Sequence, residues 1–264
     1  MMLRRTLLAT LASTLTAGCA NPPSGPSAQE RQALAPTGRL RVGVYPGSPS
    51  SWVKDASGED RGVSVEVGKL LARRLGVPYE QIEFPRVAVV LDKLKAGQVD
   101  FAVTNATPAR ARDMDFSEPL LALELGYLVP AGSTLTSINE FDRPGIRIGV
   151  SEGSTSQATL SLALKQAKVV GAPTLQAAAQ MLTSGQVEAF ATNKAILFEM
   201  SDRLPGARVL DGRWGLEQLA IAIPKGREAA MAFLRNFAEE LKATGEVKRA
   251  ADRAGLRGTL PAAR

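Results

Sequence analysis

Short apolar runs alternate with amphipathic segments along most of this chain, and the series occurs twice. The first series consists of strand-like runs and intervening helical segments at 40–46, 63–76, 81–84, 86–97 and 99–104. The second series follows in the other half, at 145–154, 155–167, 168–171, 174–185 and 187–193. Strands joined through helices usually pair in parallel. We therefore predict two α/β lobes, each built on a mainly parallel sheet.

The last part of the chain carries elements that the second lobe does not need. A strand at 219–226 precedes helical segments at 227–245 and 246–255. These helices present apolar faces that must cover a sheet, and the first lobe has too few helices of its own. We expect the C-terminus to return there. Lobe 1 then comprises 38–128 and 225–264, and lobe 2 comprises 129–224.

One phrase occurs near the end of each series. "LDKLKAGQVDFAVTN" and "AQMLTSGQVEAFATN" both run from a helix through Gly-Gln-Val and an acid into a strand. The phrase places Asn105 and Asn193 at equivalent points, each at the C-terminal end of a strand. Ligands of open α/β sheets bind at that edge. The common helix-Gly-strand order also explains the likeness without a duplication.

The first residues predict export. Arg4 and Arg5 precede an apolar run that is too short to span a bilayer, and small residues lead to Cys19. Residues 15–19 resemble a lipobox, which predicts a signal peptide over 1–18 and lipidation of Cys19. The alternative is a plain signal peptide and an incidental thiol. The Pro- and Ser-rich residues that follow predict a flexible tether over 19–37.

The composition excludes several kinds of chemistry. The chain has no histidine, and Cys19 is its only cysteine. Histidine-based triads, cysteine nucleophiles, disulfides and His/Cys zinc sites are therefore not available to the mature body. We expect no metal or cofactor and no enzymatic activity. No basic run is interleaved with aromatic residues, so nucleic acid is not an expected partner. The net charge of +6 suits an anionic ligand.

The stretch "TNATPARARDMDFSEPL" at 104–120 carries the clearest candidate site. Thr107 is predicted to cap a helix, with Pro108 at its first position and Arg110 in its first turn. A guanidinium gives no stability at a helix N-terminus, but it can bind a carboxylate there through two charge-assisted hydrogen bonds. The alternative is an exposed Arg110 that pairs with Asp113 or Asp115.

The phrase "EGSTS" at 152–156 is the second candidate site. Gly153 permits a tight turn, and Ser154 and Thr155 open a helix whose N–H groups and hydroxyls can bind an anion. The alternative is an ordinary serine cap that binds no ligand.

Taken in order, these phrases resemble the bacterial extracellular solute-binding proteins of family 3, the receptors of polar amino-acid ABC importers. The resemblance covers about 38–255 and is most specific in the Thr-Pro-x-Arg and Asp-Phe-Ser-x-Pro motifs. It implies a two-lobed, periplasmic-binding-protein-like fold of type II, with hinge crossings near 126–132 and 222–226. It also implies a monomeric periplasmic receptor that closes on its ligand and is recognised by an ABC permease in the inner membrane. Arg110 and the 152–156 turn would bind the ligand's α-carboxylate.

The chain departs from the family where the ligand's ammonium group would bind. Asn193 and Tyr45 stand at positions that are often acidic in the family. The segment that holds Thr104 and Asn105 is about two residues shorter than usual, which leaves its mapping open. We therefore predict a small carboxylate-bearing ligand, an amino acid or a related compound. Tyr45 and Trp52 are predicted to form an aromatic wall, or else to pack within a lobe.

Two other functions fit the same scaffold. The first is an enzyme similar to cyclohexadienyl dehydratases, with Glu152 or Glu188 as the acid or base. The second is a ligand-sensing module that acts on a separate signalling partner.

Overall fold

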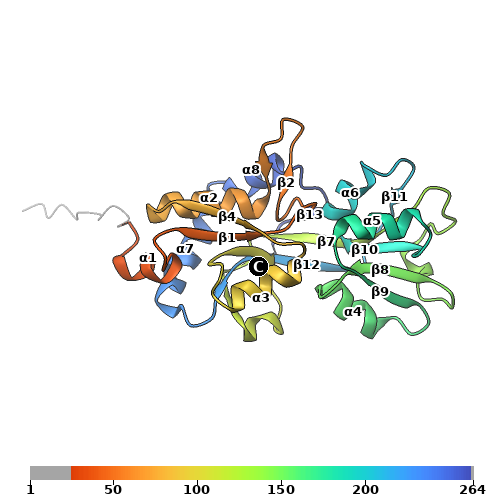
Figure 1. The fold of residues 1–264 in the computed structure, drawn as a ribbon, viewed down its shortest axis with the longest axis horizontal. Coiled ribbons are helices and arrows are strands. Elements are labelled where there is room, and N and C mark those ends of the chain that lie inside the picture. Colours follow the sequence, from red (N-terminus) through yellow and green to blue (C-terminus); the bar gives the residue numbers. More distant parts are fainter. Residues whose placement is uncertain (1–24, 263–264) are drawn as a thin grey trace, which may run out of the picture.

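The computed structural model describes residues 25–262, which form two lobes side by side along the long axis of the molecule (Figure 1). The first lobe holds the early elements, which are α1 (Ala28–Leu34), β1 (Leu40–Val44), β2 (Val53–Lys54), β3 (Asp60–Arg61), α2 (Val63–Leu75), β4 (Tyr79–Glu83), α3 (Val87–Lys95), β5 (Ala102–Asn105), η1 (Arg110–Arg112) and β6 (Met114–Phe116). The chain returns there at its end as η3 (Glu228–Ala230), α7 (Met231–Ala243), α8 (Glu246–Arg253) and β13 (Thr259–Leu260).

The second lobe consists of η2 (Ile138–Glu140), β8 (Arg147–Ser151), α4 (Thr155–Ala163), β9 (Lys168–Ala172), α5 (Leu175–Thr183), β10 (Ala189–Asn193), α6 (Lys194–Ser201) and β11 (Arg208–Val209). Two long strands, β7 (Leu121–Val129) and β12 (Gly215–Pro224), pair antiparallel and connect the lobes (Figure 1). The strand order β5-β12-β7-β10-β8-β9 therefore runs from one lobe into the other. The predicted two-lobed α/β class with two crossings is confirmed.

Parallel pairing within each lobe follows from the strand-helix-strand connections. Strand β1 pairs parallel with β4 across α2. In the second lobe, β8 pairs parallel with β9 across α4 and with β10 on its other side. The C-terminal ends of these strands face the boundary between the lobes, where ligands of α/β sheets bind.

Apolar packing shows where one lobe gives way to the other. Leu121 and Leu123 of β7 pack in the first-lobe core, whereas Leu128 packs in the second lobe. On β12, Leu219 already belongs to the first-lobe core. This packing favours lobe boundaries inside β7 and at the start of β12. The boundaries at 128/129 and 224/225 stay predictions.

In each lobe, an acid forms an ion pair and hydrogen bonds with an arginine at the start of the first strand. We call this arrangement an ionic clip. In lobe 1, Asp100 accepts hydrogen bonds from the backbone N–H and guanidinium of Arg41, which also donates to the carbonyl of Gly97. In lobe 2, Glu188 and Arg147 repeat this pattern, and Arg147 donates to the carbonyl of Gly185. The repeated Gly-Gln-Val-acid phrase thus has the same structural purpose twice, because it brings a carboxylate to the start of the neighbouring strand.

The predicted tether is partly wrong. Residues 28–34 form α1, which begins with a capping box between Ser27 and Glu30, and Leu34 is buried in the first-lobe core. The capping box was readable in the sequence as Ser-x-x-Glu. The predicted signal peptide and Cys19 lie outside the described residues. Among residues 25–262, no helix combines the length and apolar character needed to cross a membrane.

The end of the described chain binds the crossing strands. Strand β13 pairs with β7 at Ala122 and Leu123. Just before it, Arg257 forms an ion pair with Asp202 and lies over the ring of Phe198, both in the second lobe. The C-terminal segment therefore packs with lobe 1 and also contacts lobe 2.

Candidate functional site

A small cavity of about 30 Å³ lies between the lobes, at the level of the crossing strands. Both lobes and β12 contribute to its wall. The lining residues are Tyr45, Ser50, Val87, Val103, Thr104, Asn105, Arg110, Ser151, Ser154, Thr155, Thr192, Asn193, Ile196, Glu217 and Leu219. The predicted residues Tyr45, Thr104, Asn105, Arg110, Ser154, Thr155 and Asn193 thus meet in one place, although five separate segments carry them.

Arg110 points into this cavity from the start of η1. Its guanidinium donates to the hydroxyl of Thr104 at 2.8 Å and to the carbonyl of Asn105 at 3.1 Å. Burial lowers the pKa of Arg110, because the charged guanidinium loses hydration. Two partners for five N–H donors leave it able to bind a carboxylate in addition.

The predicted local reason for this placement needs a correction. The turn after Thr107 is a 3-10 helix over Arg110–Arg112, not an α-helix, although the Thr107 hydroxyl does accept the N–H of Arg110 at 3.3 Å. Thr107 therefore supports Arg110 without lining the cavity. Asp113 and Asp115 pair with Lys95 and Lys225, and neither neutralises Arg110.

Glu217 is the functional candidate that the sequence reasoning missed. It lies on β12, and only 8% of its surface is exposed. Its carboxylate accepts hydrogen bonds from Thr155 at 3.2 Å and from the side-chain amide of Asn193 at 3.0 Å. Burial raises the pKa of Glu217 despite the nearby Arg110 charge and these two hydrogen bonds. The signal was an acid inside the run "WGLEQLAIAIP", just before the point where a strand was expected.

Two asparagines at equivalent strand ends line the cavity, one from each lobe. Asn105 donates to the hydroxyl of Thr155 at 3.3 Å and accepts the backbone N–H of Gln218 at 2.9 Å. Asn193 caps α6 by accepting the N–H of Ile196, and its amide donates to Glu217. The equivalence that the repeated phrase predicts is therefore present in the geometry.

The 152–156 turn forms the second-lobe wall. The hydroxyl of Ser154 caps α4 by accepting the N–H of Gln157 at 3.1 Å, and Thr155 is the first residue of that helix. Gly153 lies outside the cavity and serves another purpose. Its φ is +73°, and a Cβ there would lie 2.6 Å from the Cβ of Ala88 in lobe 1. Glycine at 153 thus permits the close approach of the lobes.

The two predicted aromatic residues differ in position. Tyr45 lines the cavity, and burial raises the pKa of its phenol. Trp52 does not line it. Its ring packs in the first-lobe core, and its indole N–H donates to Asp60 at 2.8 Å. The packing alternative therefore holds for Trp52.

Contacts on either side of the cavity bring the lobes together. Arg86 of lobe 1 pairs with Glu152 of lobe 2 at 3.5 Å, next to the approach of Ala88 and Gly153. Elsewhere along the boundary, a Cβ on Gly47 would lie 3.2 Å from the side chain of Leu175. The described conformation is therefore closed.

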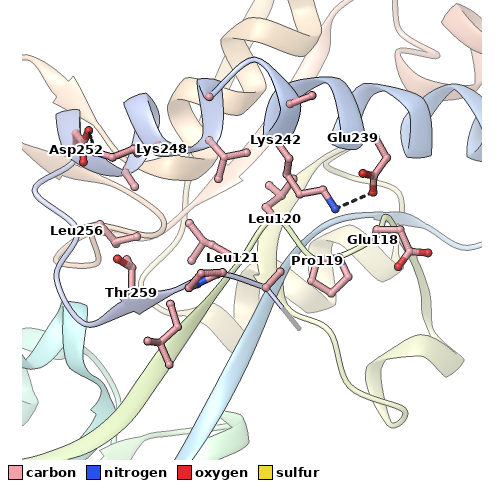
Figure 2. A pocket seen from close by; sticks show the side chains of 17 residues that line it. Glu118, Pro119, Leu120, Leu121, Glu239, Lys242, Lys248, Asp252, Leu256 and Thr259 are labelled. Atoms are coloured by element: carbon pink, nitrogen blue, oxygen red, sulfur yellow. Dashed lines mark hydrogen bonds and ion pairs between the residues drawn. The ribbon is translucent and has the colours of Figure 1, made fainter. Parts of the chain in front are cut away.

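A larger groove of about 1020 Å³ lies away from this site, between α7, α8, β13 and the start of β7 (Figure 2). Its floor is apolar, with Leu120, Leu121 and Leu256. Two ion pairs lie at its rim, between Lys242 and Glu239 (Figure 2) and between Lys248 and Asp252, and Glu118 also lines it.

Within residues 25–262, no cluster of side chains has the composition of a metal site. The cavity holds neither histidine nor thiol, and its chemistry is that of opposite charges, hydroxyls and amides. Such a site can bind a small zwitterion without a cofactor.

Comparison with known proteins gives a consistent result. The sequence pattern of the bacterial extracellular solute-binding proteins, family 3, matches residues 40–255. A glutamine-binding protein from Geobacillus stearothermophilus is 26% identical over 237 residues, covering 83% of this chain and 90% of that protein. The glutamine-binding protein of an ABC transporter from Bacillus subtilis is 25% identical over 194 residues, covering 72% and 71%. The solved solute receptor for L-cysteine of Neisseria gonorrhoeae is 25% identical, with a TM-score of 0.75, and covers 85% of this chain and 92% of that one.

Proposed function

The chain belongs to the bacterial extracellular solute-binding proteins of family 3, and we propose that it binds an amino acid between its lobes and delivers it to an ABC importer. The glutamine-binding proteins and the L-cysteine receptor to which it is similar support this class of ligand. The same resemblance supports a periplasmic location and a permease as the partner.

The observation that carries the proposal is the pair of opposite charges in the cavity. Arg110 and Glu217 each use neutral partners: the guanidinium donates to Thr104 and Asn105, and the carboxylate accepts from Thr155 and Asn193. A desolvated ion that lacks a direct counter-ion is costly. A zwitterionic amino acid supplies both counter-ions at once, with its carboxylate on Arg110 and its ammonium on Glu217.

This assignment resolves the departure at Asn193. The acid that the family often carries at this strand end is absent, but Glu217 of β12 brings a carboxylate within 3.0 Å of the same side chain. The ammonium partner has thus moved from the second lobe to a strand that joins the lobes. The ligand remains a complete amino acid on this account.

Isothermal titration calorimetry with a panel of amino acids tests the proposal. Loss of one partner of a buried charge pair costs about 2–5 kcal/mol, so Arg110→Ala and Glu217→Gln should each lower affinity at least about 30-fold. The matched controls are Arg112→Ala and Glu118→Gln, which are outside the cavity and should bind like the wild type. Unchanged affinity in Arg110→Ala would falsify the site assignment.

One observation favours an enzymatic alternative. A buried carboxyl group with a raised pKa is suited to proton transfer, and Glu217 has both properties in a closed cavity. The previously considered acids do not: Glu152 is half-exposed and pairs with Arg86, and Glu188 is held by Arg147. Turnover of a prephenate-like substrate that is lost in Glu217→Gln would support the enzyme. Binding of an intact amino acid, recovered unchanged, supports the receptor.

We also propose that Cys19 is lipidated and anchors the receptor to a membrane of the cell envelope. Helix α1 lies at the end of lobe 1 that is farthest from lobe 2 (Figure 1), so a tether attached there leaves the opening between the lobes unobstructed. Cys19→Ser should move the protein from the membrane fraction to the soluble fraction. The same distribution in both forms would contradict the anchor.

A further inference from the structure

The charges that line the interlobe cavity are one cation and one anion. Arg110 and Glu217 are the only charged residues among its lining side chains. If the backbone groups of an amino acid use both, no charged partner remains for its side chain. A lysine or arginine side chain would then place a second cation in a partly desolvated site without an acid, and a glutamate side chain would lack a base.

The small volume of the cavity also favours a ligand with a small side chain. The closed cavity measures about 30 Å³, which leaves room for roughly two water molecules. Any ligand must hold the lobes slightly further apart than they are here. The lobes approach closely here, since an added Cβ would lie 2.6 Å from Ala88 at Gly153 and 3.2 Å from Leu175 at Gly47. A larger ligand side chain would hold these surfaces apart and cost closure contacts.

Aliphatic side chains close the remaining space. Val87 comes from α3 of lobe 1, Ile196 from α6 of lobe 2, and Leu219 from β12. Ile196 and Leu219 are buried in the cores of their lobes, at 3% and 2% exposure, so they cannot move aside easily. The hydroxyl residues Ser50, Ser151 and Thr192 also line the cavity.

We infer that the ligand is an amino acid with a small, uncharged side chain: glycine, alanine or serine in preference to glutamine, glutamate, lysine or arginine. This inference rests on the proposed function, because it assigns Arg110 and Glu217 to the carboxylate and ammonium of the ligand. It names the substrate class of that same site.

Calorimetric titration with these seven amino acids measures the preference directly. Glycine, L-alanine or L-serine should bind at least tenfold more tightly than L-glutamine, since a hydrophobic wall discriminates by about 10- to 200-fold for each methylene. L-Lysine, L-arginine and L-glutamate should bind more weakly still. Tighter binding of glutamine or of any charged amino acid would overturn the inference but would leave the amino-acid receptor intact.

A variant on the wall provides an independent test. Val87→Ala removes two methyl groups from a half-buried helix position and should improve glutamine binding relative to glycine by about fivefold or more. Val89→Ala on the same helix is the matched control, because Val89 does not line the cavity. An unchanged ratio in Val87→Ala would show that the wall does not select the ligand.

The experiments distinguish a failure of the proposed function from a failure of the preference for small side chains. If none of the seven amino acids binds, and small carboxylates without an ammonium group do, the proposed function is wrong and the preference for small side chains falls with it. If amino acids bind and depend on Arg110 and Glu217 but show no size preference, only the further inference is wrong.

Discussion

The side-chain amide of Asn193 donates a hydrogen bond of 3.0 Å to the carboxylate of Glu217. Because the carbonyl oxygen of Asn193 caps α6 by accepting the N–H of Ile196, its amide is fixed toward Glu217. The amide thus orients the carboxylate and offers no charge of its own. This geometry indicates that the pair works as one unit, in which only one member can be an acid.

A charge exchange tests this unit. Asn193→Asp places a second carboxylate against Glu217, and we expect amino-acid affinity to fall about tenfold, since like charges in a buried site disfavour ionisation of one another. The double variant Asn193→Asp with Glu217→Gln has one acid again and should recover most of the loss. Titration calorimetry on the four proteins of this cycle gives the coupling. Additive effects of the two substitutions would contradict the model of a single unit.

The raised pKa of Glu217 predicts a pH-dependent stability. In the unfolded chain the carboxyl group ionises near its ordinary pKa of 4.5, whereas burial raises the pKa in the folded protein. Between these values the folded state holds a proton that the unfolded state releases, so the free energy of unfolding falls as pH rises through that window. Glu217→Gln should remove this loss. Ligand-free Glu217→Gln should therefore melt a few degrees above the wild type at pH 8 and near it at pH 4.

Calorimetric melting of both proteins from pH 4 to pH 8 measures the difference. Saturating ligand should reduce it, because the ammonium group stabilises the charged carboxylate of the wild type alone. If the two ligand-free proteins keep a constant difference across this range, Glu217 does not titrate on unfolding.

The two ionic clips predict unequal costs for the same substitution. Asp100 is fully buried between Arg41 and Arg227, so Asp100→Asn leaves two arginines without a counter-ion and should cost about 3–5 kcal/mol. Glu188 is 30% exposed at its side chain and has one arginine partner. Glu188→Gln should cost about 1 kcal/mol or less. Urea unfolding followed by circular dichroism compares them, and equal midpoints would refute the distinction.

The close approach of the lobes can be tested by introducing a steric clash at Gly153 and then relieving it at Ala88. Gly153→Ala adds a Cβ that would lie 2.6 Å from the Cβ of Ala88, and we expect ligand affinity to fall about tenfold as closure is hindered. Gly132→Ala is the control, since Gly132 has the same left-handed backbone with no neighbour within 4 Å. It should lose about 1 kcal/mol of stability without loss of affinity. Ala88→Gly should partly restore binding to Gly153→Ala, and failure to do so would show that backbone strain alone is responsible.

The alternation of strands and helices was predictable because it depends on neighbours in the sequence. The face of α2, its end at Gly76 and the repeated Gly-Gln-Val phrase are local signals, and the structure places elements there. The full extent of β7 and β12 was not predictable in this way. Those strands pair with each other over a separation of about ninety residues, and no local pattern records such a partner.

In the candidate site, too, residues marked by a local sequence pattern were predicted and residues without one were missed. Arg110 was predicted because Thr107 and Pro108 precede it in a recognisable turn. Glu217 was missed because a strand begins at Gly215 and not at Leu219. Its partners Thr155 and Asn193 are distant in the sequence, and only the folded chain brings them to its carboxylate. Helix α1 was missed for a different reason: the composition around it obscured a short capping signal at Ser27 and Glu30.

The position of β13 has a practical consequence for anyone who attaches a label to this molecule. Strand β13 pairs with β7, and the last described residues, Pro261 and Ala262, line the groove beside α7 and α8. A bulky fluorescent domain fused there would press on the strands about which the lobes must turn. A reporter attached at helix α1, at the opposite extremity of lobe 1 (Figure 1), can report the movement of the lobes without hindering it.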